Sequence, residues 1–136
     1  MPDELTGREV AGFRLGERLG SGGTGDVYVA TPVQRGAGPA RCVKVLRHLR
    51  HNRVRRQLFR REYDRLLLVP EHPNLVRVFP STDDTDSLPE IDGRPLYQME
   101  WVQGRSLREA LGPGPLTLSQ AVGYMTSIAD AVMALH

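Results

Sequence analysis

The sequence has very little cysteine and no long apolar run. Its single thiol, Cys42, excludes an intrachain disulfide and is typical of proteins from a reducing compartment, so we expect a cytoplasmic protein. No uninterrupted apolar stretch approaches the roughly 18 to 20 residues needed to span a bilayer, which excludes a membrane-spanning helix in this segment. The first residues, Met1–Glu4, contain neither a basic nor an apolar segment, so no secretory signal is predicted.

Lysine is equally scarce, since Lys44 stands alone beside seventeen arginines. Because an ammonium and a guanidinium differ in shape and flexibility, a lone lysine in this background points to specific chemistry at position 44. Ten of the eighteen basic residues lie between Arg41 and Arg65, while the net charge is only +2. This basic run has no interleaved aromatic residues, so we expect a solvated helix face and no nucleic-acid binding. A surface for acidic partners is the minor alternative.

The composition, 40% hydrophobic and 25% charged over 136 residues, suits one packed domain or part of a larger one. Helical periodicity predicts a helix from about Asn52 to Val69, with Val54, Leu58 and Leu66 on its apolar face. Capping boxes predict two more helices, starting at Ser106 and Thr117. Apolar alternation and β-branched runs predict five strands, at 13–19, 27–29, 42–46, 75–79 and 96–102. An α+β fold follows.

The glycine cluster Gly20-x-Gly22-x-x-Gly25 lies between the first two predicted strands. Glycines let backbone amides approach phosphate oxygens closely. A dinucleotide-binding unit is excluded because the residues after Gly25 are strand-like where a helix is required, and a Walker loop is excluded because Gly-Lys-Ser/Thr is absent. The remaining interpretations are a phosphate-covering flap between antiparallel strands and an ordinary flexible hairpin tip.

Lys44 lies on the predicted third strand, beneath this flap, where its ammonium could reach phosphates. Glu62 is spaced four residues from both Leu58 and Leu66, so it lies on the apolar stripe of its helix. A buried carboxylate is costly unless it is paired. Lys44 is the specific candidate partner, and a local pair with Arg65 is the alternative. Taken singly, Lys44 could also be an ordinary surface charge.

Five motifs in order resemble a protein kinase domain of the bacterial Ser/Thr type. They are Leu19-Gly-Ser-Gly-Gly-Thr-Gly-Asp-Val27, Cys42-Val-Lys44, Phe59-Arg-Arg-Glu62, His72-Pro-Asn and Met99-Glu-Trp-Val-Gln-Gly. The resemblance implies an ATP-binding N-lobe over 13–102, with a five-stranded antiparallel sheet and one long helix. An N-terminal extension, 1–12, would precede it, and the hinge exit and the first two helices of an incomplete C-lobe, 103–136, would follow.

The resemblance also implies the roles of individual residues. Lys44 would contact the ATP α- and β-phosphates and pair with Glu62, the two residues assigned to catalysis. The residues expected to bind ATP are Leu19, Gly20, Ser21, Gly22, Gly23, Thr24, Gly25, Val27, Cys42, Lys44, Met99, Glu100 and Val102. Leu19 and Val27 would cover adenine, and Met99 matches the gatekeeper. Cys42 and Thr24 depart from the residues usual in the family and would tune affinity.

The resemblance implies a function in which a longer parent protein transfers the ATP γ-phosphoryl group to a Ser or Thr hydroxyl of a protein substrate, with Mg²⁺. The sequence contains no catalytic-loop or Asp-Phe-Gly motif, so the isolated chain is expected to be inactive and to lack metal ligands. A non-catalytic nucleotide-binding or protein-interaction module is the alternative. The last helix, apolar on a broad stripe, is expected to promote self-association.

Overall fold

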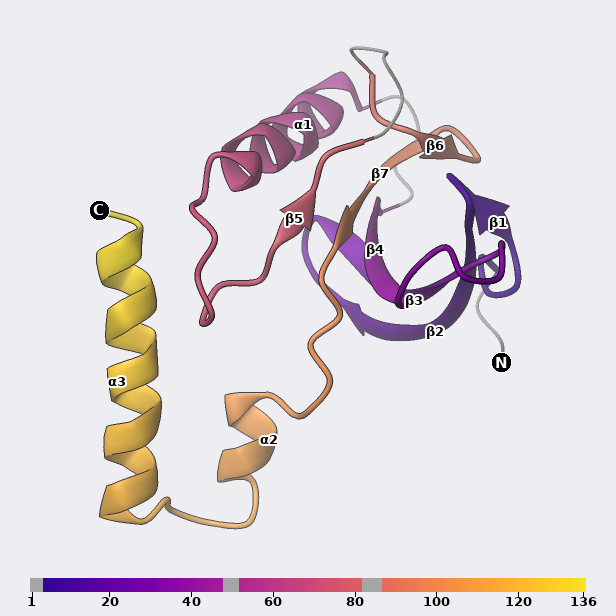
Figure 1. Ribbon diagram of the computed structural model, residues 1–136. Coiled ribbons are helices and arrows are strands. Elements are labelled where there is room, and N and C mark those ends of the chain that lie inside the picture. The colour runs from indigo at the N-terminus through magenta and orange to yellow at the C-terminus, as the bar shows by residue number, and fades with distance from the viewer. Residues whose placement is uncertain (1–3, 48–51, 82–86) are drawn as a thin grey trace. The chain divides into compact units, whose positions relative to one another are not determined.

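The computed structural model describes residues 4–47, 52–81 and 87–136 (Figure 1). The chain divides into two compact units, one formed by Met1–Leu68 with Val78–Trp101 and the other by Val69–Arg77 with Val102–His136. Within the described residues, none of the helices is long and apolar enough to cross a membrane.

The first unit consists of an antiparallel sheet and one helix (Figure 1). It contains strands at all five predicted places, although the strand predicted at 75–79 is only two residues long and the one predicted at 96–102 ends at Met99. Two further short strands are present, and the predicted antiparallel α+β fold is confirmed. The sheet order is β1-β2-β3-β4-β7-β5, and β6 pairs with β7 outside this path. The strands are β1 (Glu9–Val10), β2 (Phe13–Ser21), β3 (Gly25–Pro32), β4 (Arg41–Leu46), β5 (Val78–Phe79), β6 (Glu90–Ile91) and β7 (Arg94–Met99).

The segment before Phe13 is part of this packing. Strand β1 pairs with β2, and the Thr6 hydroxyl donates a hydrogen bond to the Gly16 carbonyl at 3.0 Å. Leu5 is fully buried in the larger apolar cluster of the unit. That cluster consists of Leu5, Leu15, Tyr28, Ala30, Val43, Val45, Ile91 and Leu96. Residues 4–12, predicted as an extension, therefore lie within the first unit.

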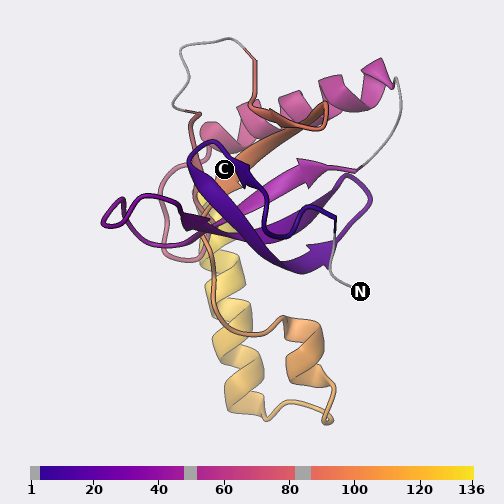
Figure 2. The same ribbon diagram turned by 90° about the vertical axis from the view of Figure 1, so that its right-hand side faces the viewer.

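Helix α1 (Arg53–Leu67) lies along the sheet beside β7 (Figure 2). The Asn52 side chain caps its N-terminus by accepting a hydrogen bond from the Arg55 amide. The predicted apolar face is correct only in part, because Leu66 packs against the core whereas Val54 and Leu58 are 63% and 54% exposed. The buried residues of this helix are Phe59 and Tyr63. Aromatic packing against β7 decides which face turns inward. Glu62, next to Tyr63 in the sequence, faces the sheet as predicted and contacts Lys44.

A second apolar cluster fills the space between α1 and the sheet. The Tyr97 ring lies 5.1 Å from the Phe59 ring and 5.6 Å from the Tyr63 ring, measured between centroids. Leu46 and Leu88 complete the buried part of this cluster. Since one strand residue packs against two helix residues one turn apart, the position of α1 on the sheet is closely defined.

The second unit contains α2 (Leu107–Leu111) and α3 (Leu118–Ala134), which lie side by side (Figures 1 and 2). Both predicted capping boxes are confirmed: Ser106 pairs with Glu109 and Thr117 with Gln120. The side-chain amide of Asn74 donates to the Ser127 backbone carbonyl at 3.1 Å. This hydrogen bond joins the segment Val69–Arg77 to α3.

Candidate functional site

Two rows of side chains cross strands β3, β4 and β7 on the sheet face toward α1. In the first row, Val27 is opposite Lys44, which is opposite Tyr97. In the second row, Val29 is opposite Cys42, which is opposite Met99. Directly opposed residues project from the same face, so the rows place the lysine among mostly apolar neighbours.

The two predicted charged residues meet at this face. Lys44 Nζ donates to Glu62 Oε1 at 2.6 Å, and their side chains are 17% and 30% exposed. The lysine pairing is thus the one observed, and not the local alternative with Arg65. An ammonium carries three N–H donors, and this hydrogen bond uses one of them. The remaining donors can serve a second anionic group at the same place.

Tyr97 adds a second donor to the same carboxylate oxygen, with its hydroxyl 2.6 Å from Glu62 Oε1. Burial raises the pKa of Glu62, but the hydrogen bonds from Lys44 and Tyr97 and the charge of Lys44 together outweigh burial and hold that pKa below its usual value. Burial first, and then the hydrogen bond to the Glu62 carboxylate, raise the pKa of Tyr97 well above the ordinary value for a phenol. At neutral pH the site therefore holds a carboxylate at Glu62 and a neutral phenol at Tyr97.

The glycine-rich hairpin between β2 and β3 has glycines of two kinds. A Cβ on Gly25 would lie 2.5 Å from the Val45 carbonyl oxygen, so β4 leaves no room for a side chain there. A Cβ on Gly20 or Gly23 would meet nothing within 4 Å, and on Gly22 only an ordinary contact at 3.8 Å. None of these glycines has a positive φ. The fold therefore requires Gly25, whereas the bareness of the other three suits the close approach of a ligand.

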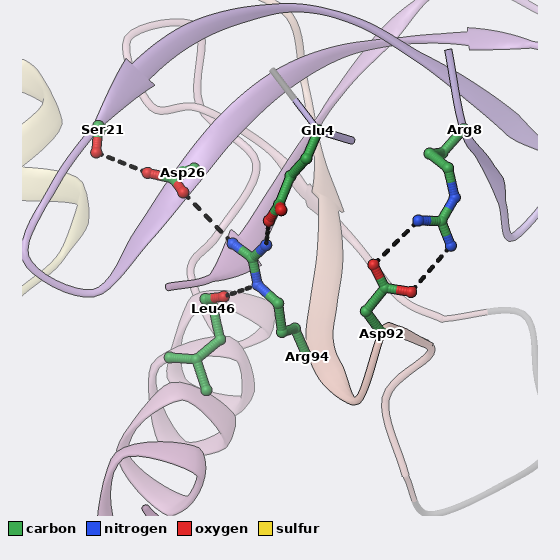
Figure 3. Close-up of polar contacts among 7 residues, drawn as sticks. All are labelled: Glu4, Arg8, Ser21, Asp26, Leu46, Asp92 and Arg94. Atoms are coloured by element: carbon green, nitrogen blue, oxygen red, sulfur yellow. Dashed lines mark hydrogen bonds and ion pairs between the residues drawn. The ribbon is translucent and has the colours of Figure 1, made fainter. Parts of the chain in front are cut away.

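A buried arginine fixes the base of this hairpin (Figure 3). Arg94 donates to the Asp26 carboxylate at 3.4 Å and to the Leu46 carbonyl at 2.7 Å. Its third partner is Glu4, at 3.3 Å. The Ser21 hydroxyl donates to the other oxygen of Asp26 at 2.6 Å and accepts a hydrogen bond from Arg47. The two arms of the hairpin are therefore joined at Ser21 and Asp26, which are also paired in register.

The other predicted ligand-binding residues lie as follows. Leu19, 47% exposed, lies near the end of β2, and Thr24 is in the hairpin turn. Cys42 is buried, and burial raises the pKa of its thiol. Glu100 follows β7 directly in the first unit. Val102 belongs to the second unit, so its role beside the sheet stays a prediction.

Sequence reasoning missed Tyr97, Asp26 and Arg94. Tyr97 carries a usable signal, because it is two residues before Met99 in a strand and so shares its face. Asp26 and Arg94 are far apart in the sequence, and nothing local indicates that their charges meet.

The described residues contain no group of three or more His, Cys, Asp or Glu side chains arranged to hold a metal ion.

No family model matches the chain. Among curated proteins, serine/threonine-protein kinase pkn2 of Myxococcus xanthus is 35% identical over 125 residues, which are 91% of this chain and 14% of that protein. Pkn1 of the same organism is 36% identical over 135 residues, 98% of this chain and 18% of that protein. PknJ of Mycobacterium tuberculosis is 31% identical over 138 residues, which are 100% of this chain and 22% of that protein.

Solved structures agree on the fold. The crystal structure of the Mycobacterium tuberculosis PknI kinase domain superposes with a TM-score of 0.67 over 98% of this chain and 52% of that domain, at 21% sequence identity. The fold is therefore that of a protein kinase N-lobe with the start of a C-lobe, and the chain is a relative of the bacterial serine/threonine protein kinases. It spans only a small share, 14% and 18%, of the two Myxococcus relatives.

Proposed function

We propose that this chain is the ATP-binding part of a serine/threonine protein kinase, whose whole protein transfers the γ-phosphoryl group of ATP to protein hydroxyls. The single observation that carries the proposal is the Lys44–Glu62 ion pair on the sheet face beside a glycine-rich hairpin. A partly buried ion pair is weak evidence for stability, since desolvation offsets much of its attraction. A pair kept in such a place is better explained by a ligand that uses its charge.

In the proposed complex, Lys44 would donate to α- and β-phosphate oxygens while Glu62 holds its ammonium in place. The Gly22 amide already donates to the Gly25 carbonyl at 2.9 Å and closes the hairpin. The backbone around Gly23 would approach the phosphates, because no side chain at Gly22 or Gly23 blocks it. When ATP is bound it supplies the electrophilic γ-phosphorus, with Mg²⁺ neutralising the phosphate charge in the complete kinase. The residues of this chain would bind and orient the nucleotide.

The adenine would lie against the apolar row of Val29, Cys42 and Met99, with Leu19 and Val27 above it. The backbone of Glu100 and Val102 would supply the polar contacts to the base edge. Val27, Val29 and Met99 are half-buried, so this row offers an apolar surface of the kind that suits a planar aromatic ring, with the buried Cys42 between them.

Binding is tested by calorimetric titration of the 136-residue chain with ATP, with and without Mg²⁺. Replacing the ammonium in Lys44→Met is expected to weaken ATP binding about tenfold or more, since a charge-assisted hydrogen bond to phosphate contributes about 1.5 to 3 kcal/mol. Arg35→Gln removes one positive charge from an exposed loop residue and serves as the matched control. Equal ATP affinity in the Lys44 and Arg35 variants, or no binding at millimolar ATP, would refute the proposal.

We further propose a cytoplasmic location and no phosphoryl transfer by these residues alone. A radiolabelled-ATP assay with Mg²⁺ and a generic protein substrate is expected to show no incorporation by the chain. Robust transfer would contradict this part of the proposal without affecting nucleotide binding.

A further inference from the structure

We propose that Tyr97 is a positioning residue that anchors Glu62 independently of Lys44, so that helix α1 is held in the nucleotide-binding arrangement before any nucleotide arrives. This inference rests on the proposed function for its consequence in binding. Its geometric part concerns Glu62 alone.

Two donors from different strands converge on one carboxylate oxygen. Lys44 on β4 and Tyr97 on β7 each lie 2.6 Å from Glu62 Oε1, and the two donors are opposite each other in register. Glu62 is thus held at two points of the sheet. When a phosphate draws the ammonium of Lys44 toward itself, the phenol still retains the carboxylate.

The Tyr97 side chain is itself firmly placed. The residue is 2% exposed, and its ring packs against those of both Phe59 and Tyr63, which are on successive turns of α1. A phenol with two χ angles, packed by aromatic neighbours, loses little further freedom when it donates its hydrogen bond. Because its pKa is raised, the hydroxyl remains a donor throughout the neutral pH range.

A second tyrosine of the same cluster offers a matched comparison. The Tyr63 hydroxyl accepts a hydrogen bond from the Ser81 backbone amide at 2.8 Å, whereas the Tyr97 hydroxyl donates to Glu62. Tyr97→Phe and Tyr63→Phe therefore remove the same atom from the same apolar cluster, but only the first removes a donor to the carboxylate.

The experiment measures the pKa of the Glu62 carboxyl by carbon-detected NMR titration of the 136-residue chain and its two variants. We expect Tyr97→Phe to raise the pKa of Glu62 and Tyr63→Phe to leave it unchanged. In the same samples, Tyr97→Phe is expected to weaken ATP binding about three- to tenfold, and Tyr63→Phe less than twofold. Denaturant unfolding establishes that both variants are folded.

The outcomes separate the two proposals. A Glu62 pKa unchanged in Tyr97→Phe, or shifted equally in both variants, overturns the role of Tyr97. If the wild-type chain does not bind ATP, the proposed function fails, while the titration still decides whether Tyr97 anchors Glu62. A raised Glu62 pKa with unchanged ATP affinity overturns the claim that this anchor supports binding.

Discussion

The carboxylate of Asp26 and the guanidinium of Arg94 lie 3.4 Å apart in the interior of the first unit, where the two residues are 8% and 6% exposed. Asp26 directly follows the last glycine of the hairpin, and Arg94 opens β7. A long-range ion pair thus holds the hairpin at its base. The tip itself carries glycines, so it has little side-chain bulk.

Neutralising this pair should destabilise the chain. In Asp26→Asn the Arg94 charge remains buried with weaker partners, so the free energy of unfolding is expected to fall by about 3 kcal/mol. Urea denaturation monitored by circular dichroism measures the loss. The control is Asp92→Asn, which weakens the half-exposed Arg8–Asp92 pair and keeps a residue suited to the positive φ of 52° there. Its effect should stay below about 1 kcal/mol. Equal losses would contradict the structural role of Asp26.

The glycines of the hairpin should separate folding from binding. Gly25→Ala places a Cβ 2.5 Å from the Val45 carbonyl and is expected to cost about 1 to 3 kcal/mol or more of stability. Gly22→Ala fits the free chain, so its unfolding free energy should change by less than about 1 kcal/mol. Its affinity for ATP should nevertheless fall, because the new methyl group faces the phosphates. Thermal unfolding and calorimetry on both variants check this. A Gly22 variant with normal ATP binding would contradict the proposal that the glycine-rich hairpin covers the phosphates.

Acid should weaken the first unit through Glu62. Because the folded-state pKa of Glu62 is lowered, its contribution to stability is complete above the unfolded value of 4.5 and is lost as the pH falls through the folded value. The unfolding free energy of the wild-type chain should therefore decline below pH 4.5, and that of Glu62→Gln should decline less. Urea titrations between pH 3 and 7 compare the two profiles, and parallel profiles would show that the site is not a source of the acid sensitivity.

Helix α3 should drive self-association, because Val122, Met125 and Val132 are 56%, 64% and 47% exposed and only Ala131 of this helix is buried. Val122→Ser combined with Met125→Ser is expected to weaken association of the chain at least about tenfold, as measured by sedimentation velocity. Leu68→Ser removes an apolar side chain that is 84% exposed outside α3 and serves as the control. A monomeric wild-type chain would contradict the prediction.

Local signals sufficed for much of this fold. The capping boxes at Ser106 and Thr117 and the Asp92-Gly93 turn are encoded by neighbouring residues, and the structure has each of them. The Lys44–Glu62 contact was predictable because a lone lysine lies on a predicted strand and Glu62 lies one helical turn from Leu66, which does pack against the core. The other half of that argument fails, since Leu58 is exposed.

Long-range features were not predictable in the same way. The inward face of α1 depends on aromatic packing with Tyr97, which lies 34 residues beyond Tyr63 and pairs with it only after the sheet forms. The burial of Leu5 and the Arg94–Asp26 pair likewise require the complete sheet. Residues 4–12 show no strand periodicity, since β1 is only two residues long.

The scarcity of lysine gives this chain a convenient chemical property. Apart from the α-amino group, Lys44 carries the only primary amine, and its side chain is 17% exposed. A reagent selective for primary amines, applied near neutral pH, therefore has two amines to modify, which intact-mass spectrometry resolves. The rate of the internal reaction reports whether a ligand occupies the sheet face, without any introduced label.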